Sequence, residues 1–366
     1  GCGARLSGWK ERGGNDLEKV KKQVSTDMTK GSPAKLICLF ALPLLAGNLL
    51  QQTYNIIDAA IVGQILGAKA LASVGASSSV QFLVLGFCMG CCTGFGVPVA
   101  KYFGAEKMDT MRNYVFNGAV LTGGIGVTVT ILCSVFCPQI LHLLSVPEDI
   151  FRGAYHYLLI IFLGIPFTLL YNYLSSILRS LGDSRTPFMF LAFSACLNIF
   201  LDLLFIVPFR MGVGGAAWAT ILSQLLSAIL SLVVGLKNFP VLHLHREDFH
   251  DLKASAFLHL KTGFPMGFQM SVMCIGQLAM QAVVNGLGTA AVAGYTAASK
   301  ADQLSVLVNN AMMTAISNYV AQNFGAGRKD RIRQGVRACL IQTEAFNLVM
   351  CIGILLLRHP IVQMFL

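Results

Sequence analysis

Two polar residues lie one helical turn apart inside an otherwise apolar run. The stretch "SACLNIFLDLLFIVP" contains Asn198 and Asp202, and a second acid, Asp58, lies in another apolar run, eight residues before Leu66. An ionised carboxylate in hydrocarbon is strongly unfavourable, so it persists only where something binds it, pairs with it or protonates it. Cation binding, proton binding and pairing with a basic side chain are therefore the chemistries to weigh at these acids.

The composition indicates an all-α polytopic membrane protein. Hydrophobic residues make up 55% of the 366 residues against 12% charged ones, and the mean hydropathy is +0.66. Soluble domains do not reach this balance. Runs of about 20 apolar residues, enough to cross roughly 30 Å of hydrocarbon, recur along the chain. The nine expected spans are Leu36 to Leu66, Leu71 to Val97, Tyr114 to Phe136, Tyr155 to Leu178, Phe188 to Pro208, Gly212 to Leu236, Leu258 to Val284, Val292 to Val320 and Arg333 to Leu357, and a tenth is expected to begin at Pro360.

The basic residues predict the orientation. With the N-terminus in the cytoplasm, the cytoplasmic segments hold 22 of the 27 Lys and Arg residues, as the positive-inside rule requires. The net charge of +10 therefore indicates topology and contact with anionic lipid headgroups, and it does not favour nucleic-acid binding. We expect a multi-pass protein of the cell membrane with a cytoplasmic N-terminus.

The chain repeats itself at an offset of 221 residues. "VAKYFGAEKMD" from Val99 aligns with "VAQNFGAGRKD" from Val320, and "GAKALASVGA" from Gly67 aligns with "GTAAVAGYTA" from Gly288. Six spans separate equivalent helices, so the two halves are parallel repeats with an expected substrate path between them. The domains expected are a polar cytoplasmic tail (1–35), an N-lobe with spans one to six (36–236), a cytoplasmic linker (237–257) and a partial C-lobe with spans seven to nine and the start of the tenth (258–366).

Four oxygen-bearing side chains of the first lobe are expected at one membrane depth. A rise of 1.5 Å per residue puts Asp202 roughly 9 Å, and Asp58 and Thr220 roughly 12 Å, below the outer surface, with Asn198 about one turn deeper than Asp202. Oxygen ligands of this kind suit a hard monovalent cation. Two nearby carboxylates also suit a proton. A structural role is the alternative, in which an acid pairs with a lysine or caps a broken helix.

Several motifs together resemble the multidrug and toxic compound extrusion (MATE) family. They are "DAAIVGQILGAKALASVG" in the first span, "FGA" after the second, "RSLGDSRTP" after the fourth, and the Asn and Asp of the fifth. The resemblance implies a twelve-helix secondary transporter with two six-helix lobes, which uses a sodium or proton gradient to expel organic, often cationic, compounds. It also implies a first-lobe cation site formed by Asp58, Asn198, Asp202 and Thr220.

Three other polar residues have two alternative roles. Lys300, Asp302 and Glu344 either line the cavity or complete a second-lobe site, or else they lie at helix ends near the headgroups. "CMGCC" at Cys88 to Cys92 is expected to be packing rather than a metal site, and Gly86, Gly90 and Gly94 beside it form a face for close helix contact. "HLHREDFH" is interpreted as solvated linker, so we expect neither a metal site nor a cofactor.

The function expected is therefore cation-coupled export of small organic substrates by a monomer embedded in lipid. A flippase for lipid-linked oligosaccharides, from the same superfamily, is the alternative. Such flippases carry several basic residues in the cavity, and here only Lys300 qualifies. No catalytic Ser, His and Asp set, metal cluster or phosphate loop occurs at a shared depth, so an enzyme is not expected.

Overall fold

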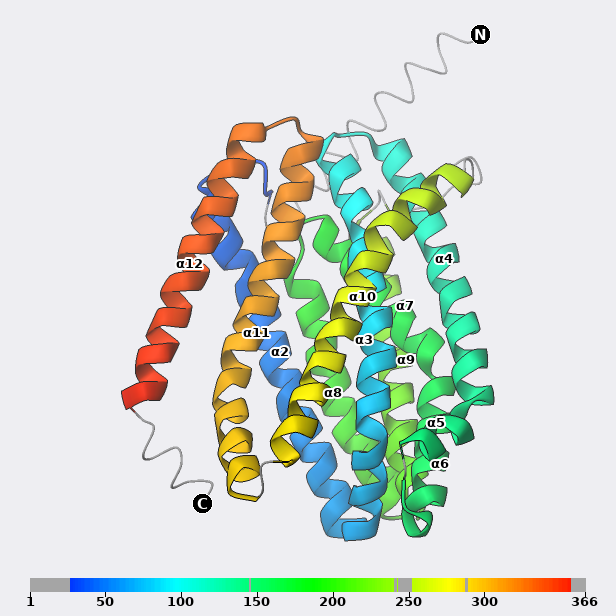
Figure 1. The fold of residues 1–366 in the computed structure, drawn as a ribbon. Helices are drawn as coiled ribbons and strands as arrows, with labels where there is room; N and C mark the ends of the chain where they lie inside the picture. Colours follow the sequence, from blue (N-terminus) through cyan, green and yellow to red (C-terminus); the bar gives the residue numbers. More distant parts are fainter. Residues whose placement is uncertain (1–26, 145, 240–241, 243–251, 287–288, 357–366) are drawn as a thin grey trace, which may run out of the picture.

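The computed structural model describes residues 27–144, 146–239, 242, 252–286 and 289–356, and over these residues it contains helices and no strands (Figure 1). Each of the nine expected spans coincides with a helix or a helix pair, which confirms the all-α architecture. The elements are α2 (Pro33–Ile61), the π-helix η1 (Val62–Leu66), α3 (Ala68–Gly104), α4 (Met108–Val135), α5 (Cys137–Leu143), α6 (Glu148–Leu163), α7 (Ile165–Ser180), α8 (Arg185–Ile206), α9 (Val213–Asn238), α10 (Leu252–Asn285), α11 (Thr289–Gly325) and α12 (Lys329–Leu356). The tenth span expected from Pro360 lies outside the described residues.

Most of these helices can cross a membrane. Within the described residues, seven helices are long and apolar enough to do so, and the bent pair α6–α7 makes an eighth span. Helix α11, at the eighth expected span, is not among them; its sequence includes Lys300, Asp302 and the adjacent amides Asn309 and Asn310. The chain is a multi-pass membrane protein.

The fourth expected span, Tyr155 to Leu178, is covered by two helices instead of one. Helices α6 and α7 meet at Gly164 with a bend of 46°. Pro166 lies in the first turn of α7, where its missing N–H is tolerated but cannot continue the hydrogen bonding of α6. A Cβ atom on Gly164 would lie 2.3 Å from Cγ1 of Ile221, so this glycine also lets α9 approach the break.

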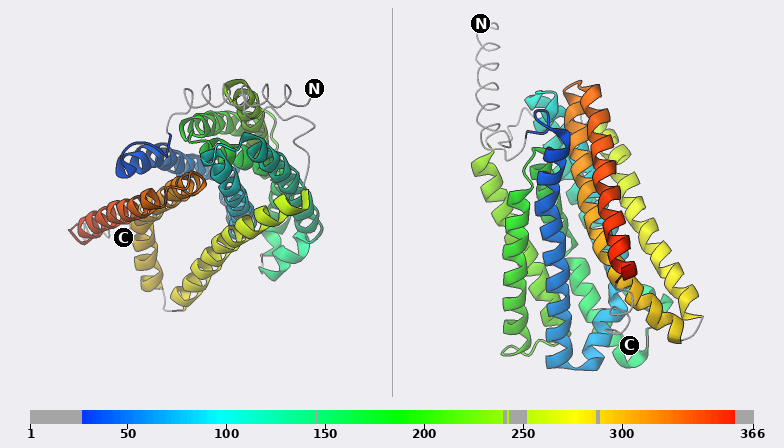
Figure 2. Two further views of the ribbon diagram at one scale, coloured as in Figure 1. Left: turned by 90° about the horizontal axis from the view of Figure 1, so that it is seen from above. Right: turned by 90° about the vertical axis from the view of Figure 1, so that its left-hand side faces the viewer.

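The helices form one elongated bundle. Helix α12 lies on the opposite side of the molecule from helices α4, α5 and α6. This holds when the bundle is viewed from the side and when it is viewed from above (Figures 1 and 2). Helix α2 begins at the end of the bundle where α3 and α11 terminate (Figure 1, top). We call this the basic end, because Lys35, Lys101, Lys107, Arg328 and Arg331 lie there.

Helices α3 and α10 pack through glycines, as the spacing of Gly86, Gly90 and Gly94 predicted. A Cβ atom on Gly94 would lie 2.5 Å from the Cα atom of Gly263, and one on Gly90 would lie 2.7 Å from the Cα atom of Gly267. Both helices therefore present glycines spaced by four residues, which allows the two backbones to touch. We call this contact the glycine seam.

The corresponding contact between α2 and α11 is made by alanines. Ala41, Ala311 and Ala315 are buried there in an apolar cluster with Met28, Ile37 and Tyr319. Met28, which precedes α2, is fully buried in this cluster, and α2 begins at Pro33. The three cysteines of "CMGCC" (Cys88, Cys91 and Cys92) are buried in a second apolar cluster, in agreement with a packing role.

Candidate functional site

The two acids predicted from the sequence lie together inside the first lobe. Asp58 is near the end of α2 and Asp202 is near the end of α8, and their carboxyl groups are within hydrogen-bonding reach of one another. Asp202 is fully buried and Asp58 is partly buried. A hydrogen bond between two carboxyl groups requires a proton on one of them, so this geometry suits a pair that shares a proton. We call these residues the acid pair.

The two other predicted residues are joined to each other beside Asp202. Nδ2 of Asn198 is 3.4 Å from Oγ1 of Thr220 and donates to it. That hydroxyl donates in turn to the carbonyl of Ala216, 3.0 Å away on α9. Asn198 lies one turn from Asp202 on the same face of α8, and its side chain is only 3% exposed. Helices α2, α8 and α9 thus contribute oxygen atoms to one region.

The oxygen atoms of this region lack protein donors. Oδ1 of Asp58, both carboxylate oxygens of Asp202 and Oδ1 of Asn198 are buried and receive no hydrogen bond from another group in the described part of the chain. The ion pair found among the described residues joins Arg112 to Asp109, at the start of α4. Buried carboxylate oxygens without donors are unfavourable unless a cation or a proton neutralises them.

Two tyrosines extend the acid pair beyond the residues predicted from the sequence. Tyr157 of α6 lies close enough to Asp58 and Asp202 to interact with both electrostatically, and the side chain of Gln81 on α3 is also near its hydroxyl. Tyr54 interacts with Asp58 from four residues earlier on α2. The i, i+4 spacing could have identified Tyr54. Tyr157 had no sequence signal, because it reaches the acid pair from another helix and no local spacing relates it to either acid.

The backbone next to Asp58 departs from regular α-helix. The π-helix η1 begins four residues after Asp58, and it ends at Gly67, whose φ of 89° is in the left-handed region that favours glycine. Single π-turns inside helices occur frequently at functional sites. The motif "DAAIVGQILGAKALASVG" therefore encodes both an acid and the irregular turn that follows it.

Comparisons with known proteins agree with this arrangement. A family model described as MatE matches residues 43–204 and 265–366. The chain belongs to the MatE family. The "Probable multidrug resistance protein YpnP" of Bacillus subtilis (strain 168) is 35% identical over 310 residues, which cover 84% of this chain and 68% of that protein. A second B. subtilis protein, "Probable multidrug resistance protein YoeA", is 28% identical over 94% of this chain and 76% of its own length.

A solved structure described as "MATE in the bent conformation" has the same fold as this MatE protein. It superposes with a TM-score of 0.86 at 23% identity, over 93% of this chain and 77% of that one. The resemblance drawn from the sequence motifs is thereby confirmed for the family and the fold.

The remaining predicted residues of this MatE protein are on α11 and α12. Asp302 on α11 and Glu344 on α12 are exposed, and the side chain of Lys300 lies outside the described residues. Their assignment to a cavity or a second-lobe site stays a prediction. "HLHREDFH" also lies almost entirely outside the described residues. Within the part described, no three His, Cys, Asp or Glu residues are grouped as a metal site would need.

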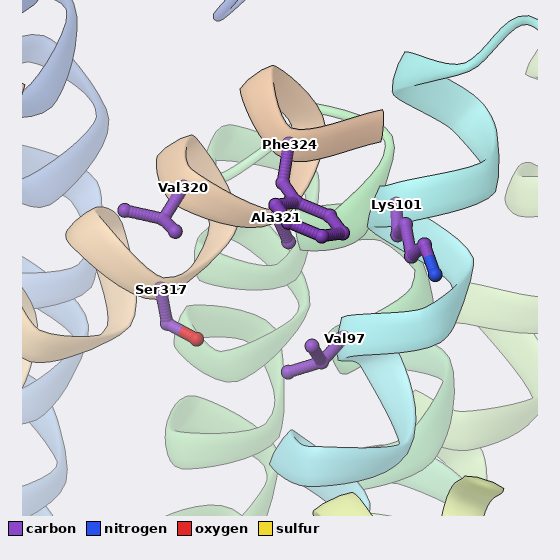
Figure 3. Close-up of a pocket in the computed structure, with 6 residues that line it drawn as sticks. All are labelled: Val97, Lys101, Ser317, Val320, Ala321 and Phe324. Atoms are coloured by element: carbon purple, nitrogen blue, oxygen red, sulfur yellow. The ribbon is translucent and has the colours of Figure 1, made fainter. Parts of the chain in front are cut away.

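A pocket of about 290 Å³ lies between α3 and α11 near the basic end (Figure 3). The ring of Phe324 points from α11 toward Lys101 on α3, and its centroid is 5.4 Å from Nζ of that lysine. The pocket is mostly apolar and lies directly beside the close contact between the backbones of α3 and α11. Its lining residues are Val97, Lys101, Ser317, Val320, Ala321 and Phe324.

Proposed function

We propose that this MatE protein is a secondary active exporter, in which a cation or proton entering at the acid pair drives small organic, often cationic, compounds out of the cell. The observation that carries the proposal is the burial of Asp58 and Asp202 side by side without a basic partner among the described residues. The relatives described as multidrug resistance proteins support the substrate class.

Coupling follows if the two arrangements of the lobes bind the cation or proton with different affinities. A ligand shifts a conformational equilibrium only by its differential affinity for the two states. Neutralising the acid pair removes the repulsion between two buried carboxylates, so it changes the free energy of the first lobe from within. We propose that sodium and protons compete for this site, with the amide of Asn198 and the hydroxyl of Thr220 as additional oxygen ligands.

We also propose that the basic end faces the cytoplasm of the cell and that the acid pair lies toward the outer half of the membrane. The distribution of Lys and Arg supports this orientation. The flippase alternative depended on Lys300, and the described residues give it no further support. No metal or cofactor is part of the proposal.

Transport by reconstituted protein tests the proposal. Proteoliposomes are given a sodium gradient alone or a pH gradient alone, and uptake of a cationic dye is followed in each. We expect one gradient to drive uptake, and we expect Asp58→Asn and Asp202→Asn each to abolish it while the proteins still insert. Normal gradient-driven uptake by both variants would overturn the role of the acid pair. Flipping of a lipid-linked sugar without dye transport would favour the alternative.

A further inference from the structure

A buried histidine joins α10 to the first lobe at the basic end. His259 lies two turns into α10 and is fully buried. Its Nδ1 atom is 2.9 Å from the carbonyl of Ser255, one turn earlier on the same helix. Its Nε2 atom is buried and receives no hydrogen bond, and the main-chain carbonyl of Tyr114 on α4 lies within interaction range of the ring.

Aromatic rings and a glycine fix the position of this imidazole. The ring of Tyr114 stacks on it at 5.3 Å and 19°, and Phe95 of α3 meets it edge-on at 5.2 Å and 72°. A Cβ atom on Gly118 would lie 2.7 Å from Nε2 of His259 and 2.5 Å from Oη of Tyr173. A larger residue at this position of α4 would force one or both of these side chains to shift.

The internal repeat provides a comparison within the same chain. Aligning α10 with α2 on Pro265 and Pro43, an offset of 222, places His259 opposite Ile37. The offset of 221 places Gly118 opposite Cys339. Ile37 and Cys339 are buried together in the apolar cluster between α2, α11 and α12. In the second repeat, apolar side chains therefore occupy the positions equivalent to His259 and Gly118. Packing alone does not require an imidazole at position 259.

We propose that His259 is a proton-binding site, separate from the acid pair, that fastens α10 to α4 at the basic end. A neutral imidazole has one N–H, and here the Ser255 carbonyl accepts it, which leaves Nε2 bare toward the Tyr114 carbonyl. A second proton on Nε2 provides a donor for that carbonyl. The hydrogen bond gained in this way runs from α10 to α4.

Among the described residues, no charged side chain next to the His259 ring gives the contact between α10 and α4 another source of pH dependence. The titratable groups that contact it or share its space are the phenols of Tyr114 and Tyr173, and Phe95 and Ser255 do not titrate. Among the described residues, no carboxylate, ammonium or guanidinium group interacts with the ring. The stacked face of Tyr114 attracts a cationic ring. Acidification therefore fastens α10 to α4, and alkaline conditions loosen it.

A polar contact beside His259 does not depend on this proton. Nδ2 of Asn117 on α4 donates to Oγ of Ser255 on α10 at 2.5 Å. This bond holds the same two helices together at any pH. The histidine thus adds a contact that responds to protons to one that does not.

The test uses full-length chain in liposomes with the Asp202→Asn substitution, so that titration of the acid pair and failure of coupled transport do not affect the readout. Solid-state NMR of ¹⁵N-labelled histidine distinguishes singly from doubly protonated rings, and the His259→Gln spectrum assigns the signal. We expect the His259 ring to become doubly protonated as the pH is lowered from about 8 to about 4, a range that extends below the usual titration range of histidine because the ring is buried. A ring that stays singly protonated throughout would overturn the proposal.

Hydrogen exchange of peptides from the first turns of α10 tests the fastening itself. After correction for the intrinsic pH dependence of exchange, we expect acidification to slow exchange roughly three- to tenfold, as one additional hydrogen bond would do. His259→Ile introduces the residue type found at the equivalent position 37 of the other repeat, and it should abolish this response. Equal slowing in both proteins would disprove the fastening. The NMR measurement observes His259 itself in a protein that keeps this residue. A folding defect of His259→Gln or His259→Ile therefore does not prevent the proposal from being disproved.

Discussion

Gly104 lies against the main chain of Gln322, and Gly325 lies against the main chain of Lys101. Each contacted residue is three positions before the other glycine. A Cβ atom on Gly104 would lie 2.0 Å from the carbonyl oxygen of Gln322, and one on Gly325 would lie 1.8 Å from that of Lys101. The two glycines, and likewise Lys101 and Gln322, are separated by 221 residues. The internal repeat is therefore also a structural symmetry, and it brings α3 and α11 into backbone contact at the basic end.

Placing a methyl group at this crossing should separate α3 from α11. Gly104→Ala and Gly325→Ala would each put a Cβ atom where only backbone now fits, and overpacking of this kind costs about 1–3 kcal/mol. Separation should expose the pocket below the crossing. A cysteine introduced by Ser317→Cys reports on this exposure through its reaction with a membrane-impermeant maleimide added at the basic end. We expect the reaction to be at least about fivefold faster in the crossing variants, because an overpacking cost of roughly 1 kcal/mol corresponds to a change of this size in the open population.

The control for this experiment is Gly294→Ala. Gly294 is on the same helix as Gly325, and a Cβ atom there would meet nothing within 4 Å. It should leave the reactivity at position 317, measured by mass spectrometry of that peptide, unchanged. Unchanged reactivity in both crossing variants would mean that the crossing does not close the basic end.

The acid pair should behave as one unit. Because the carboxyl groups of Asp58 and Asp202 lie within reach of one another, removing either one should eliminate the exchangeable charge state of both. We expect Asp58→Asn combined with Asp202→Asn to lose no more gradient-driven transport than either single change, since residues that act together are not additive. Initial rates in proteoliposomes measure this. Residual transport in a single variant that disappears in the double variant would show that the two acids act independently.

The glycine seam should tolerate no side chain. Gly94→Ala would place a Cβ atom 2.5 Å from the Cα atom of Gly263, and we expect it to lower the free energy of unfolding by about 1–3 kcal/mol. The matched change Gly75→Ala lies on the same helix with nothing within 4 Å of its Cβ position. It should leave stability unchanged or raise it by up to about 1 kcal/mol, because alanine favours helix over glycine. Thermal unfolding in detergent compares the two, and a Gly94→Ala protein as stable as Gly75→Ala would contradict the seam.

The segment before α2 should contribute to stability through Met28. Its side chain is fully buried, and its carbonyl accepts a hydrogen bond of 2.9 Å from Nδ2 of Asn323. We expect Met28→Ala to lower the free energy of unfolding by about 2–5 kcal/mol, the usual cost of truncating a buried methionine. Met189→Ala is the control, because Met189 is 64% exposed. An equal loss of stability in the two variants would exclude a specific role for Met28.

The sequence was sufficient for the features that depend on local pattern. Apolar runs located the helices, and the four-residue spacing of Gly86, Gly90 and Gly94 identified the face that contacts α10. The depth of Asp58 and Asp202 correctly brought the two acids together, because depth along a helix follows directly from residue count.

Features that depend on how helices bend and cross were not accessible in this way. Tyr157 reaches the acid pair from α6, and its place there depends on how α6 packs against its neighbouring helices. Met28 looked like part of a polar tail, since a single apolar residue among polar ones gives no periodic signal. His259 looked unremarkable until its position could be compared with that of Ile37 in the other half.

The reciprocal crossing also limits how this protein can vary. A side chain that clashes with another side chain can be accommodated by a smaller residue opposite, but Gly104 and Gly325 each face a carbonyl group that every amino acid carries. Suppressor screens starting from a defective crossing variant should therefore recover true revertants or changes elsewhere in α3 and α11, and no compensating substitution at Lys101 or Gln322.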